Sequence, residues 1–225
     1  MNITNDKITE YLDSHYKALD DEMLEFRRIN EENGVPLILR ETESYLRMML
    51  HIIKPRKILE IGTAYGYSAI FFARCMPDST VTTIDRGQRM IPVATKNFEE
   101  WPEGERIDFR VGDAREVLDS LIDELDGREE DKYEFVFIDA GKSHYKEFFD
   151  KATKLCKPGS IIVCDNILLR GWIVDRSYEG GKRHRTNIKY MKQFIDYING
   201  REDLTVNLLS SGDGLAVIKL NEQEN

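Results

Sequence analysis

The chain has 225 residues, and its 32 Lys and Arg against 41 Asp and Glu give a formal net charge of −9. This length fits one domain with a sizeable core, and the 41% hydrophobic content argues against wholesale disorder. The acidic total argues against a protein that coats nucleic acid non-specifically, but it leaves room for a local basic patch.

The sequence carries no sign of export or membrane insertion. It has no run of about 18 apolar residues, the length that a membrane-spanning helix needs. Its N-terminus lacks the basic and then apolar segments of a signal peptide. The three cysteines, Cys75, Cys156 and Cys164, form no Cys-x-x-Cys pair, which disfavours a disulfide framework and a thiolate zinc site. We therefore expect a cytoplasmic protein.

The first quarter of the chain has a helical pattern. Residues 3–33 carry apolar side chains at helical spacing, which predicts one or two amphipathic helices. Gly34 and Pro36 interrupt this pattern, and residues 41–53 resume it. We expect a single domain over residues 1–225, in which residues 1–53 form N-terminal helices and residues 54–225 form the core.

From residue 57, short apolar runs alternate with amphipathic stretches. Strands are predicted at 57–61, 80–84, 107–111, 135–138, 161–164, 206–209 and 215–219, and helices at 67–75, 88–99, 114–125, 144–155 and 188–198. This alternation predicts an α/β fold with a seven-stranded, mostly parallel sheet and helices on both faces. The short turn at 210–214 predicts that the last two strands form an antiparallel pair at an edge, with the last strand antiparallel to the rest.

Ligands of such sheets bind beyond the carboxyl ends of the strands. After the first strand comes Glu60-Ile-Gly62-Thr-Ala-Tyr-Gly66-Tyr-Ser68, in which glycines allow close approach of a ligand. A dinucleotide fingerprint that starts at Gly62 would need glycine at positions 64 and 67, where the chain has Ala64 and Tyr67. Pyrophosphate binding, and with it an NAD-dependent oxidoreductase, is therefore disfavoured.

Acidic residues end the second and third strands. Asp85 lies 23 residues beyond Gly62, where an acid can accept hydrogen bonds from ribose hydroxyls, although it could also simply open a turn. Asp113 could cap the next helix or receive an adenine amino group. Three such strand endings in succession favour a nucleoside ligand.

The fourth and fifth strands end in oxygen-bearing side chains. Asp139 follows one strand, and Asp165 and Asn166 follow the other. If the two strands are neighbours, two carboxylates and an amide form an incomplete hard-oxygen set that suits Mg²⁺ better than Zn²⁺. Helix capping or loop hydrogen bonds are the structural alternative. Lys142, three residues after Asp139, could act as a base beside a bound cation, or it could be a solvated loop lysine.

The motifs at 60–68, Val111-Gly-Asp-Ala114, Phe137-Ile-Asp-Ala140 with Lys142, and Asp165-Asn166 together resemble the cation-dependent O-methyltransferases, the group of the catechol and caffeoyl-CoA enzymes. The resemblance covers residues 34–220 and implies a Rossmann-like fold that binds S-adenosylmethionine. It implies that Mg²⁺ is held by Asp139, Asp165 and Asn166, that Lys142 is the catalytic base, and that Asp139 also takes part near the methionine end of the cofactor. The cofactor contacts that it implies are Ile38, Gly62, Tyr67, Ser68, Asp85, Asp113, Ala114 and Asp139.

Residues 168–190 and 35–39 resemble a bacterial subgroup of this family that methylates the 5-hydroxyl of wobble 5-hydroxyuridine in tRNA. The implied partner is the tRNA anticodon loop, with Trp172 or Tyr178 available to stack on a base. Cations before a helix N-terminus oppose the helix dipole, which favours an anionic partner. The residues expected to contact phosphates are Arg176, Lys182, Arg183 and Arg185. The family resemblance also suggests a homodimer.

Two other functions remain open on the sequence. The same chemistry could act on small catechol-like or phenolic acceptors. Alternatively, the chain could be a nucleotide- or RNA-binding module that keeps the fold without catalysis.

Overall fold

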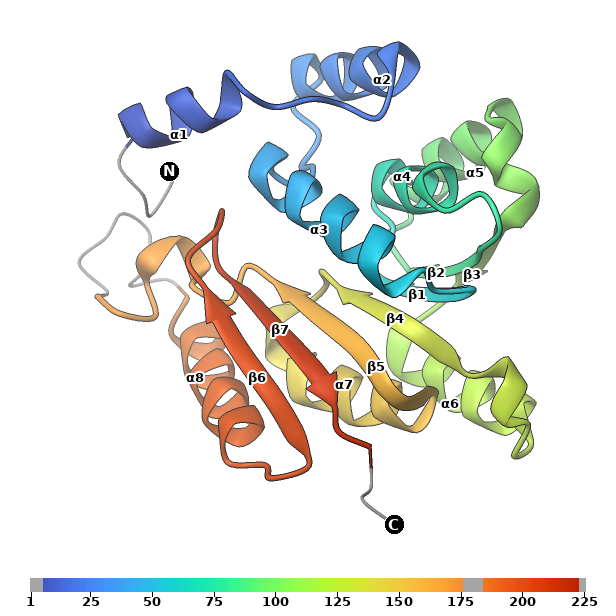
Figure 1. Ribbon diagram of the computed structural model, residues 1–225, viewed down its shortest axis with the longest axis vertical. Helices are drawn as coiled ribbons and strands as arrows, with labels where there is room; N and C mark the ends of the chain where they lie inside the picture. The colour runs from blue at the N-terminus through green and yellow to red at the C-terminus, as the bar shows by residue number, and fades with distance from the viewer. Residues whose placement is uncertain (1–5, 176–183, 223–225) are drawn as a thin grey trace.

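A seven-stranded sheet forms the centre of the computed structural model, which describes residues 6–175 and 184–222 (Figure 1). The strand order is β3-β2-β1-β4-β5-β7-β6. The strands are β1 (Lys57–Ile61), β2 (Thr80–Asp85), β3 (Ile107–Val111), β4 (Tyr133–Ile138), β5 (Cys156–Asp165), β6 (Leu204–Leu209) and β7 (Leu215–Leu220).

The first five strands pair in parallel, and β7 is antiparallel to both of its neighbours, β5 and β6. This confirms the predicted α/β fold and the antiparallel last strand. The closing hairpin places β7 inside and β6 at the edge. The reason is polarity: residues 215–218 of β7 are all buried, whereas β6 carries the exposed Thr205 and Asn207, which suit an edge strand.

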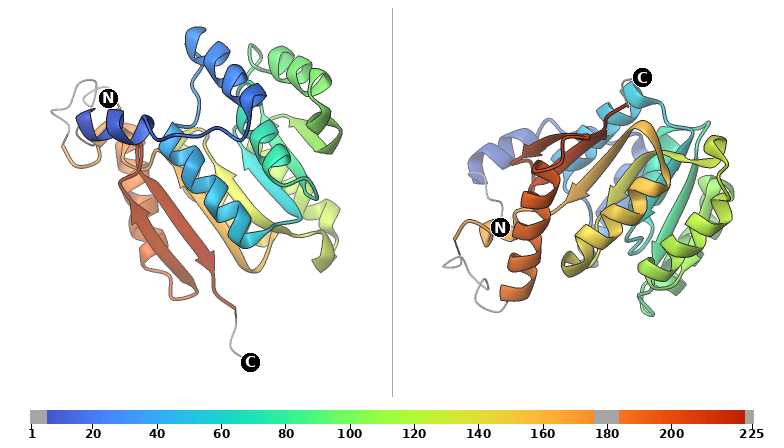
Figure 2. Two further views of the ribbon diagram at one scale, coloured as in Figure 1. Left: turned by 45° about the horizontal axis from the view of Figure 1, so that its top comes forward. Right: turned by 90° about the horizontal axis from the view of Figure 1, so that it is seen from below.

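Helices cover both faces of the sheet (Figure 2). One apolar cluster, which includes Leu118, Phe149 and Phe194, lies between the sheet and α6, α7 and α8. The other, which includes Leu46 and Phe72, lies under α3 and α4. The helices are α1 (Asp6–Asp13), α2 (Asp21–Glu32), α3 (Arg40–Ile53), α4 (Tyr67–Cys75), α5 (Ile91–Glu100), α6 (Ala114–Leu125), α7 (Tyr145–Lys154) and α8 (Arg185–Asn199).

The observed bounds match the predicted ones closely for most elements. The largest difference is β5, which begins at Cys156 rather than at residue 161. Pro158 and Gly159 look like a strand break in the sequence, but the chain continues as a strand, with Gly159 at φ +84°. The three cysteines are buried, and none of them forms a disulfide within the described residues. None of the helices in the described ranges is long and apolar enough to cross a membrane.

Candidate active site

The carboxyl ends of the parallel strands meet at one edge of the sheet, and most of the predicted site residues lie there. The pairing register sets Ile61 beside both Ile84 and Ile138, and Ile138 beside Cys164. Each of these residues directly precedes a candidate: Gly62, Asp85, Asp139 and Asp165. The sheet itself therefore brings the residues of both predicted constellations to one edge.

Gly62 is needed here for packing. Its φ is +110°, and a Cβ on it would lie 2.0 Å from the carbonyl oxygen of Asp139. The backbone amide of Asp139 donates to Ile61 O at 2.9 Å, which holds the end of β4 against the end of β1. The sequence predicts that Gly62 lets a ligand come close to the backbone. In the structure, it is the backbone of Asp139 that lies against Gly62.

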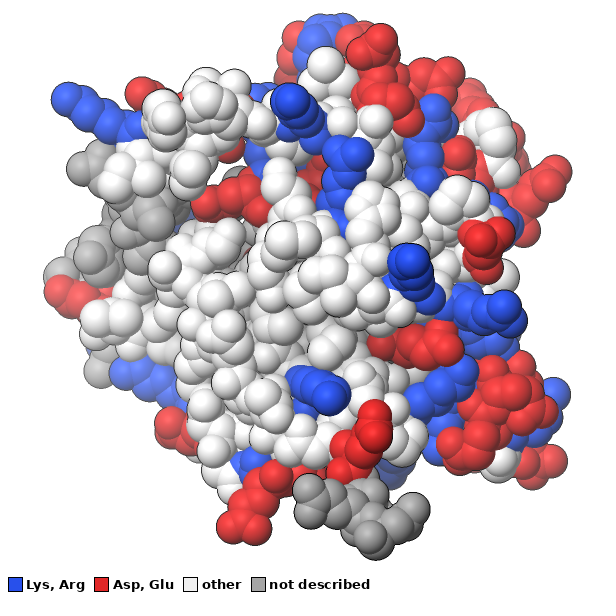
Figure 3. Space-filling view, in the orientation of Figure 1, with Lys and Arg blue, Asp and Glu red and all other residues white. Residues whose placement is uncertain are grey.

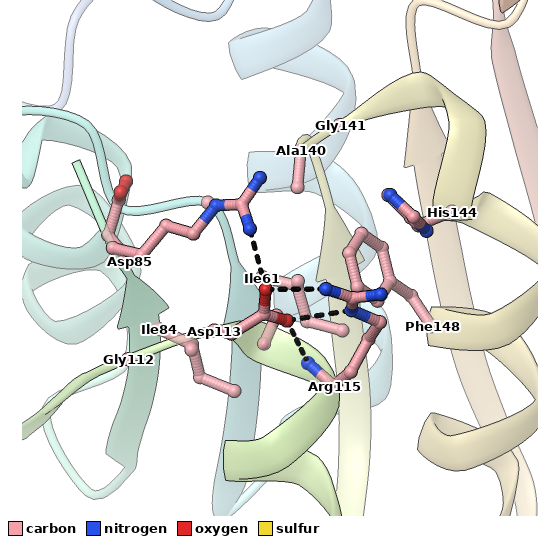
Figure 4. Close-up of a pocket in the computed structure, with 13 residues that line it drawn as sticks. Ile61, Ile84, Asp85, Gly112, Asp113, Arg115, Ala140, Gly141, His144 and Phe148 are labelled. Carbon is pink, nitrogen blue, oxygen red and sulfur yellow. Dashed lines mark hydrogen bonds and ion pairs between the residues drawn. The ribbon is translucent and has the colours of Figure 1, made fainter.

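A pocket of about 120 Å³ opens on the β2–β3 side of this edge (Figure 4). Asp113 lies at its centre, where it caps α6 by accepting from the amide of Arg115 and also pairs with the Arg115 and Arg86 guanidinium groups. These ion pairs and the cap hold the pKa of Asp113 well below its usual range. The predicted residues among those that line the pocket are Gly62, Asp85, Asp113 and Ala114.

Asp85 is oriented by backbone amides. One of its carboxylate oxygens accepts from Ala64 N at 2.8 Å and the other from Gly87 N at 2.7 Å. Each carboxylate oxygen has further acceptor capacity. Asp85 is thus fixed in place at the pocket wall and still able to receive hydroxyl donors.

Four predicted cofactor residues do not line this pocket: Ile38, Tyr67, Ser68 and Asp139, the last of which is described with the second constellation below. The Tyr67 hydroxyl is buried against Arg27 and Glu43. Ile38 is buried, and its carbonyl accepts from Arg27 at 3.0 Å. The side chain of Ser68, in the first turn of α4, lies near Glu60 of β1 and acts to lower the pKa of that carboxyl. The structure therefore places the side chains of Tyr67 and Ser68 in contacts with the protein, and it leaves their predicted cofactor role untested.

Glu60 is a buried polar residue near this edge of the sheet that the sequence motifs did not predict as a site residue. Its side chain is completely buried, with one carboxylate oxygen 2.5 Å from the Thr83 hydroxyl. Burial raises the pKa of Glu60 to about 7. Among the described residues, its Oε1 atom has no hydrogen-bond partner. The sequence gives a weak signal for this residue, which is a carboxylate inside an otherwise apolar strand.

The β4–β5 side of the edge brings the second constellation together. Lys142 Nζ lies 2.8 Å from Asp139 Oδ1 and 2.8 Å from Asn166 Oδ1, and 3.5 Å from the backbone carbonyl oxygen of Asp165. A cationic group thus lies between the two oxygen donors. Tyr145, at the start of α7, completes the arrangement: its hydroxyl is 2.8 Å from Lys142 Nζ and donates to Asp165 O at 2.7 Å.

The Asp165 carboxyl is nearly inaccessible to solvent. Burial and the nearby charge of Asp139 raise the pKa of Asp165 to about 7. One of its oxygens accepts from the amide of Asn166 at 2.6 Å. Within residues 6–175 and 184–222, no three His, Cys, Asp or Glu side chains cluster as a metal site, so the candidate set is two carboxylates and one amide.

The basic segment is described only in part. Arg176, Lys182 and Arg183, like Tyr178, lie outside the described residues. Arg185 is exposed at the first position of α8. The Trp172 ring stacks on His184 with centroids 4.4 Å apart and the ring planes 9° from parallel. The predicted stacking residue thus already has one face covered.

Comparisons with known proteins agree with this geometry. A family model described as O-methyltransferase matches residues 14–220. A catechol O-methyltransferase of Niastella koreensis is 31% identical over 180 residues, which are 77% of this chain and 80% of that protein.

Solved structures give the same picture. A Staphylococcus aureus protein provisionally described as a caffeoyl-CoA O-methyltransferase has a TM-score of 0.85 and 29% identity, and the match covers 95% of this chain and 99% of that one. The O-methyltransferase TomG of Streptomyces achromogenes, solved in complex with S-adenosylmethionine (SAM), has a TM-score of 0.78 and 25% identity over 96% of both chains. The chain belongs to the SAM-dependent O-methyltransferase family, as the resemblance of its motifs implied.

Proposed function

We propose that the protein is a Mg²⁺-dependent O-methyltransferase that transfers the methyl group of SAM to the 5-hydroxyl of wobble 5-hydroxyuridine in tRNA, giving 5-methoxyuridine. One observation supports the metal-dependent chemistry most directly. Lys142 Nζ lies 2.8 Å from a side-chain oxygen of Asp139 and 2.8 Å from one of Asn166, next to the buried carboxyl of Asp165.

The residues present fit a nucleoside with a cationic tail. Asp85 is held ready for hydroxyl donors. Glu60 Oε1 has no partner among the described residues, and we expect it to accept from an ammonium group of the bound cofactor. Pockets for small molecules usually have a volume of about 300–1,000 Å³. The pocket here is smaller, but the Arg86 and Arg115 side chains in its wall are 66% and 41% exposed. We expect both to swing outward when the cofactor binds.

The residues present also fit a divalent cation. Two carboxylates and an amide oxygen are the hard donors that Mg²⁺ prefers, and they leave positions for water and the acceptor. Burial and the charge of Asp139 raise the pKa of Asp165, and a divalent cation bound beside the two carboxylates would oppose both effects. When bound, Mg²⁺ would make the acceptor hydroxyl more acidic and orient it.

The protein's own groups then supply position and proton transfer. Lys142 Nζ is placed to take the acceptor's proton, and the Tyr145 hydroxyl fixes that nitrogen at 2.8 Å. The acceptor oxygen attacks the methyl carbon in line with the S–CH₃ bond, that bond breaks, and its electrons stay on sulfur. Holding donor and acceptor at attack distance supplies much of the remaining acceleration.

Two features support the tRNA acceptor. The 5-hydroxyl of 5-hydroxyuridine lies beside the C4 carbonyl, and this chelating pair resembles a catechol. In addition, α8 presents three exposed cations, Arg185, Lys189 and Lys192, for which the described part of the structure shows no ion pair. A groove of about 420 Å³ between α7 and α8 runs from Ser143 and His144 to Tyr190. These positive charges on an acidic protein suit a phosphate backbone.

The acceptor can be identified by a direct competition of substrates. Purified enzyme with SAM and Mg²⁺ is offered tRNA that contains 5-hydroxyuridine, and in parallel catechol. Mass spectrometry of tRNA nucleosides from a deletion strain gives the cellular answer. We expect loss of 5-methoxyuridine in that strain. Unchanged 5-methoxyuridine, together with efficient methylation of catechol in vitro, would instead assign the enzyme to small phenolic acceptors.

A binding module without catalysis makes a different prediction. It would transfer no methyl group to any acceptor and would be indifferent to Asp165→Ala. We expect Asp165→Ala to abolish methyl transfer while SAM binding is largely kept.

The homodimer that the family resemblance suggests is part of the proposal. The face that carries α3 and the β6–β7 strands is broadly uncharged (Figure 3). On α3, Met48 is 52% and Ile52 68% exposed, which suits an apolar contact. Light scattering after size exclusion should give twice the mass of one chain, and Met48→Glu with Ile52→Lys should give the single mass.

A further inference from the structure

The segment that follows β5 takes an unusual path. Asn166, Leu169 and Arg170 have φ values of +57°, +51° and +57°. They are three of the six non-glycine residues with positive φ in the described ranges. Side chains with a Cβ seldom adopt this conformation, and it persists only where the surroundings hold it. The first of the three is a predicted metal ligand.

The tip of the β6–β7 hairpin holds this segment. Ile167 N donates to Gly214 O at 3.0 Å, and Leu168 N donates to Asp213 O at 2.9 Å. The Asp213 carboxylate accepts from Arg170 N. Three hydrogen bonds to Asp213 and Gly214 therefore fix the backbone that follows Asn166, on the side away from β5.

Packing at the tip leaves this segment little freedom. A Cβ on Gly214 would lie 2.4 Å from Leu168 Cγ and 3.0 Å from Ile167 Cγ1. The hairpin tip is itself tied to α3, because Gly212 N donates to the Glu41 carboxylate. The contacts thus run from α3 through the tip to residues 167–170.

The geometry points to Asp213 as a positioning residue for the metal site. It does not contact Lys142 or Asp139 through a hydrogen bond in the described structure. By holding residues 167–170, Asp213 keeps the backbone of Asn166 in the left-handed conformation. This conformation directs Asn166 Oδ1 toward Lys142 Nζ, which Asp139 also contacts. The inference rests on the proposed Mg²⁺ dependence.

Metal binding without acceptor tests this role, with Mn²⁺ as the probe and its free electron paramagnetic resonance signal as the readout. Groups that orient metal ligands typically contribute 10–100-fold to metal affinity. We expect Asp213→Ala to weaken Mn²⁺ binding by about tenfold or more. Calorimetry should find SAM affinity within about twofold of the original, because the cofactor residues lie on other strands. Ser210→Ala, at an exposed position of the same turn, is the matched control and should bind Mn²⁺ normally.

Two further variants separate geometry from charge. Asp213→Asn keeps an acceptor for Arg170 N and should keep Mn²⁺ affinity within about threefold of the original. Asp213→Glu keeps the charge but misplaces the acceptor, so it should bind Mn²⁺ more weakly. These two variants also test the positioning role if Asp213→Ala fails to fold. The opposite ranking, or unchanged binding by Asp213→Ala, would overturn the positioning role alone. Absence of Mn²⁺ binding by the unmodified protein would overturn the proposed metal dependence as well.

Discussion

The ammonium group of Lys142 is the clearest chemical feature at the scale of single residues. It lies between oxygens of Asp139 and Asn166 and is held by Tyr145. A group that only balanced charge would not need the additional contact with the Tyr145 hydroxyl. The arrangement gives the lysine nitrogen a fixed position from which its neutral amine form can accept a proton.

Replacing this lysine should separate proton transfer from ligand binding. We expect Lys142→Met to lower kcat by about 10²–10⁴-fold, the usual contribution of a general base. SAM and Mn²⁺ should still bind, because the oxygen donors remain. Stopped assays for kcat and calorimetry for both ligands check this. A variant that keeps full kcat would remove Lys142 from the mechanism.

Glu60 gives a pH-dependent prediction. Its pKa is raised to about 7, so between pH 4.5 and 7 the folded protein holds a proton that the unfolded chain releases. This contribution to stability is complete below pH 4.5 and is lost as pH rises through 7, with a size of up to about 3 kcal/mol. Glu60→Gln keeps a neutral group at every pH.

The measurement is the free energy of unfolding in urea at pH 5 and pH 8, without ligands. The difference in unfolding free energy between the original protein and Glu60→Gln should change by a few kcal/mol from pH 5 to pH 8. The variant should be relatively more stable at pH 8. A pH-independent difference would show that Glu60 does not titrate in this range.

The sequence predicted some of these residues and not others for a physical reason. Asp139, Asp165 and Asn166 directly follow or end buried strands, and parallel strands align their ends, so their meeting could be expected. Glu60 and Asp213 act through burial and backbone contacts, which depend on tertiary packing. Their residue types alone do not reveal such contacts.

At the scale of elements, the apposition of β1 and β4 depends on Gly62. Gly62→Ala should destabilise the protein by about 3–5 kcal/mol, because its Cβ would overlap the Asp139 carbonyl and its φ is positive. Gly127→Ala is the matched control, since its φ is +75° and no atom of the described residues lies within 4 Å of the added Cβ. It should lose only about 1–2 kcal/mol in the same denaturation experiment. Equal losses would refute the steric explanation.

A buried ion pair joins two of the N-terminal helices, and a tyrosine of α4 connects it to the core. Arg27 on α2 and Glu43 on α3 are each 2% exposed and lie 2.5 Å apart, and the Tyr67 hydroxyl of α4 contacts both. Removing one partner of such a pair leaves the other buried and unpaired. We therefore expect Arg27→Met to cost about 3–5 kcal/mol of unfolding free energy.

Arg28 provides the control for this prediction, because it is 53% exposed on the same helix and pairs with Glu25 and Glu32. Arg28→Met should cost about 1 kcal/mol or less. In a double-mutant cycle, Arg27→Met with Glu43→Leu should cost less than the sum of the single changes. Additive losses would mean that the two residues stabilise the fold independently.

Element types and order followed from the hydrophobic period, and α4 and α6 were predicted at their observed bounds. The local sequence could not predict that β5 continues through Pro158 and Gly159. Pairing with the neighbouring strand overrides the turn preference of these two residues. The inner place of β7 likewise depends on how the hairpin packs against β5.

At the scale of the whole molecule, an acidic protein is proposed to bind an acidic polymer. Binding of an anticodon stem-loop should therefore depend on α8 and on salt. Log affinity falls as log salt rises, and each phosphate contact contributes about 0.7 to the steepness of that fall. Replacing Arg185, Lys189 and Lys192 by alanine should therefore make the slope shallower by about 2. Fluorescence anisotropy across a salt series measures that slope.

A charge-matched control separates α8 from net charge. Alanine at three exposed lysines outside α8 should leave the slope nearly unchanged; these are Lys54, Lys96 and Lys219. If both sets lower the slope equally, α8 is not the site of contact and attraction is non-specific.

The proposed reaction requires that Asp139, Asp165 and Asn166 hold a divalent cation. Its most direct test is transfer of a labelled methyl group by chelator-stripped enzyme, titrated with Mg²⁺, with SAM binding followed in parallel. We expect stripping to abolish transfer and Mg²⁺ to restore it. In Asp165→Ala, Mg²⁺ should restore no transfer while SAM still binds. Full transfer in the presence of chelator would contradict this requirement.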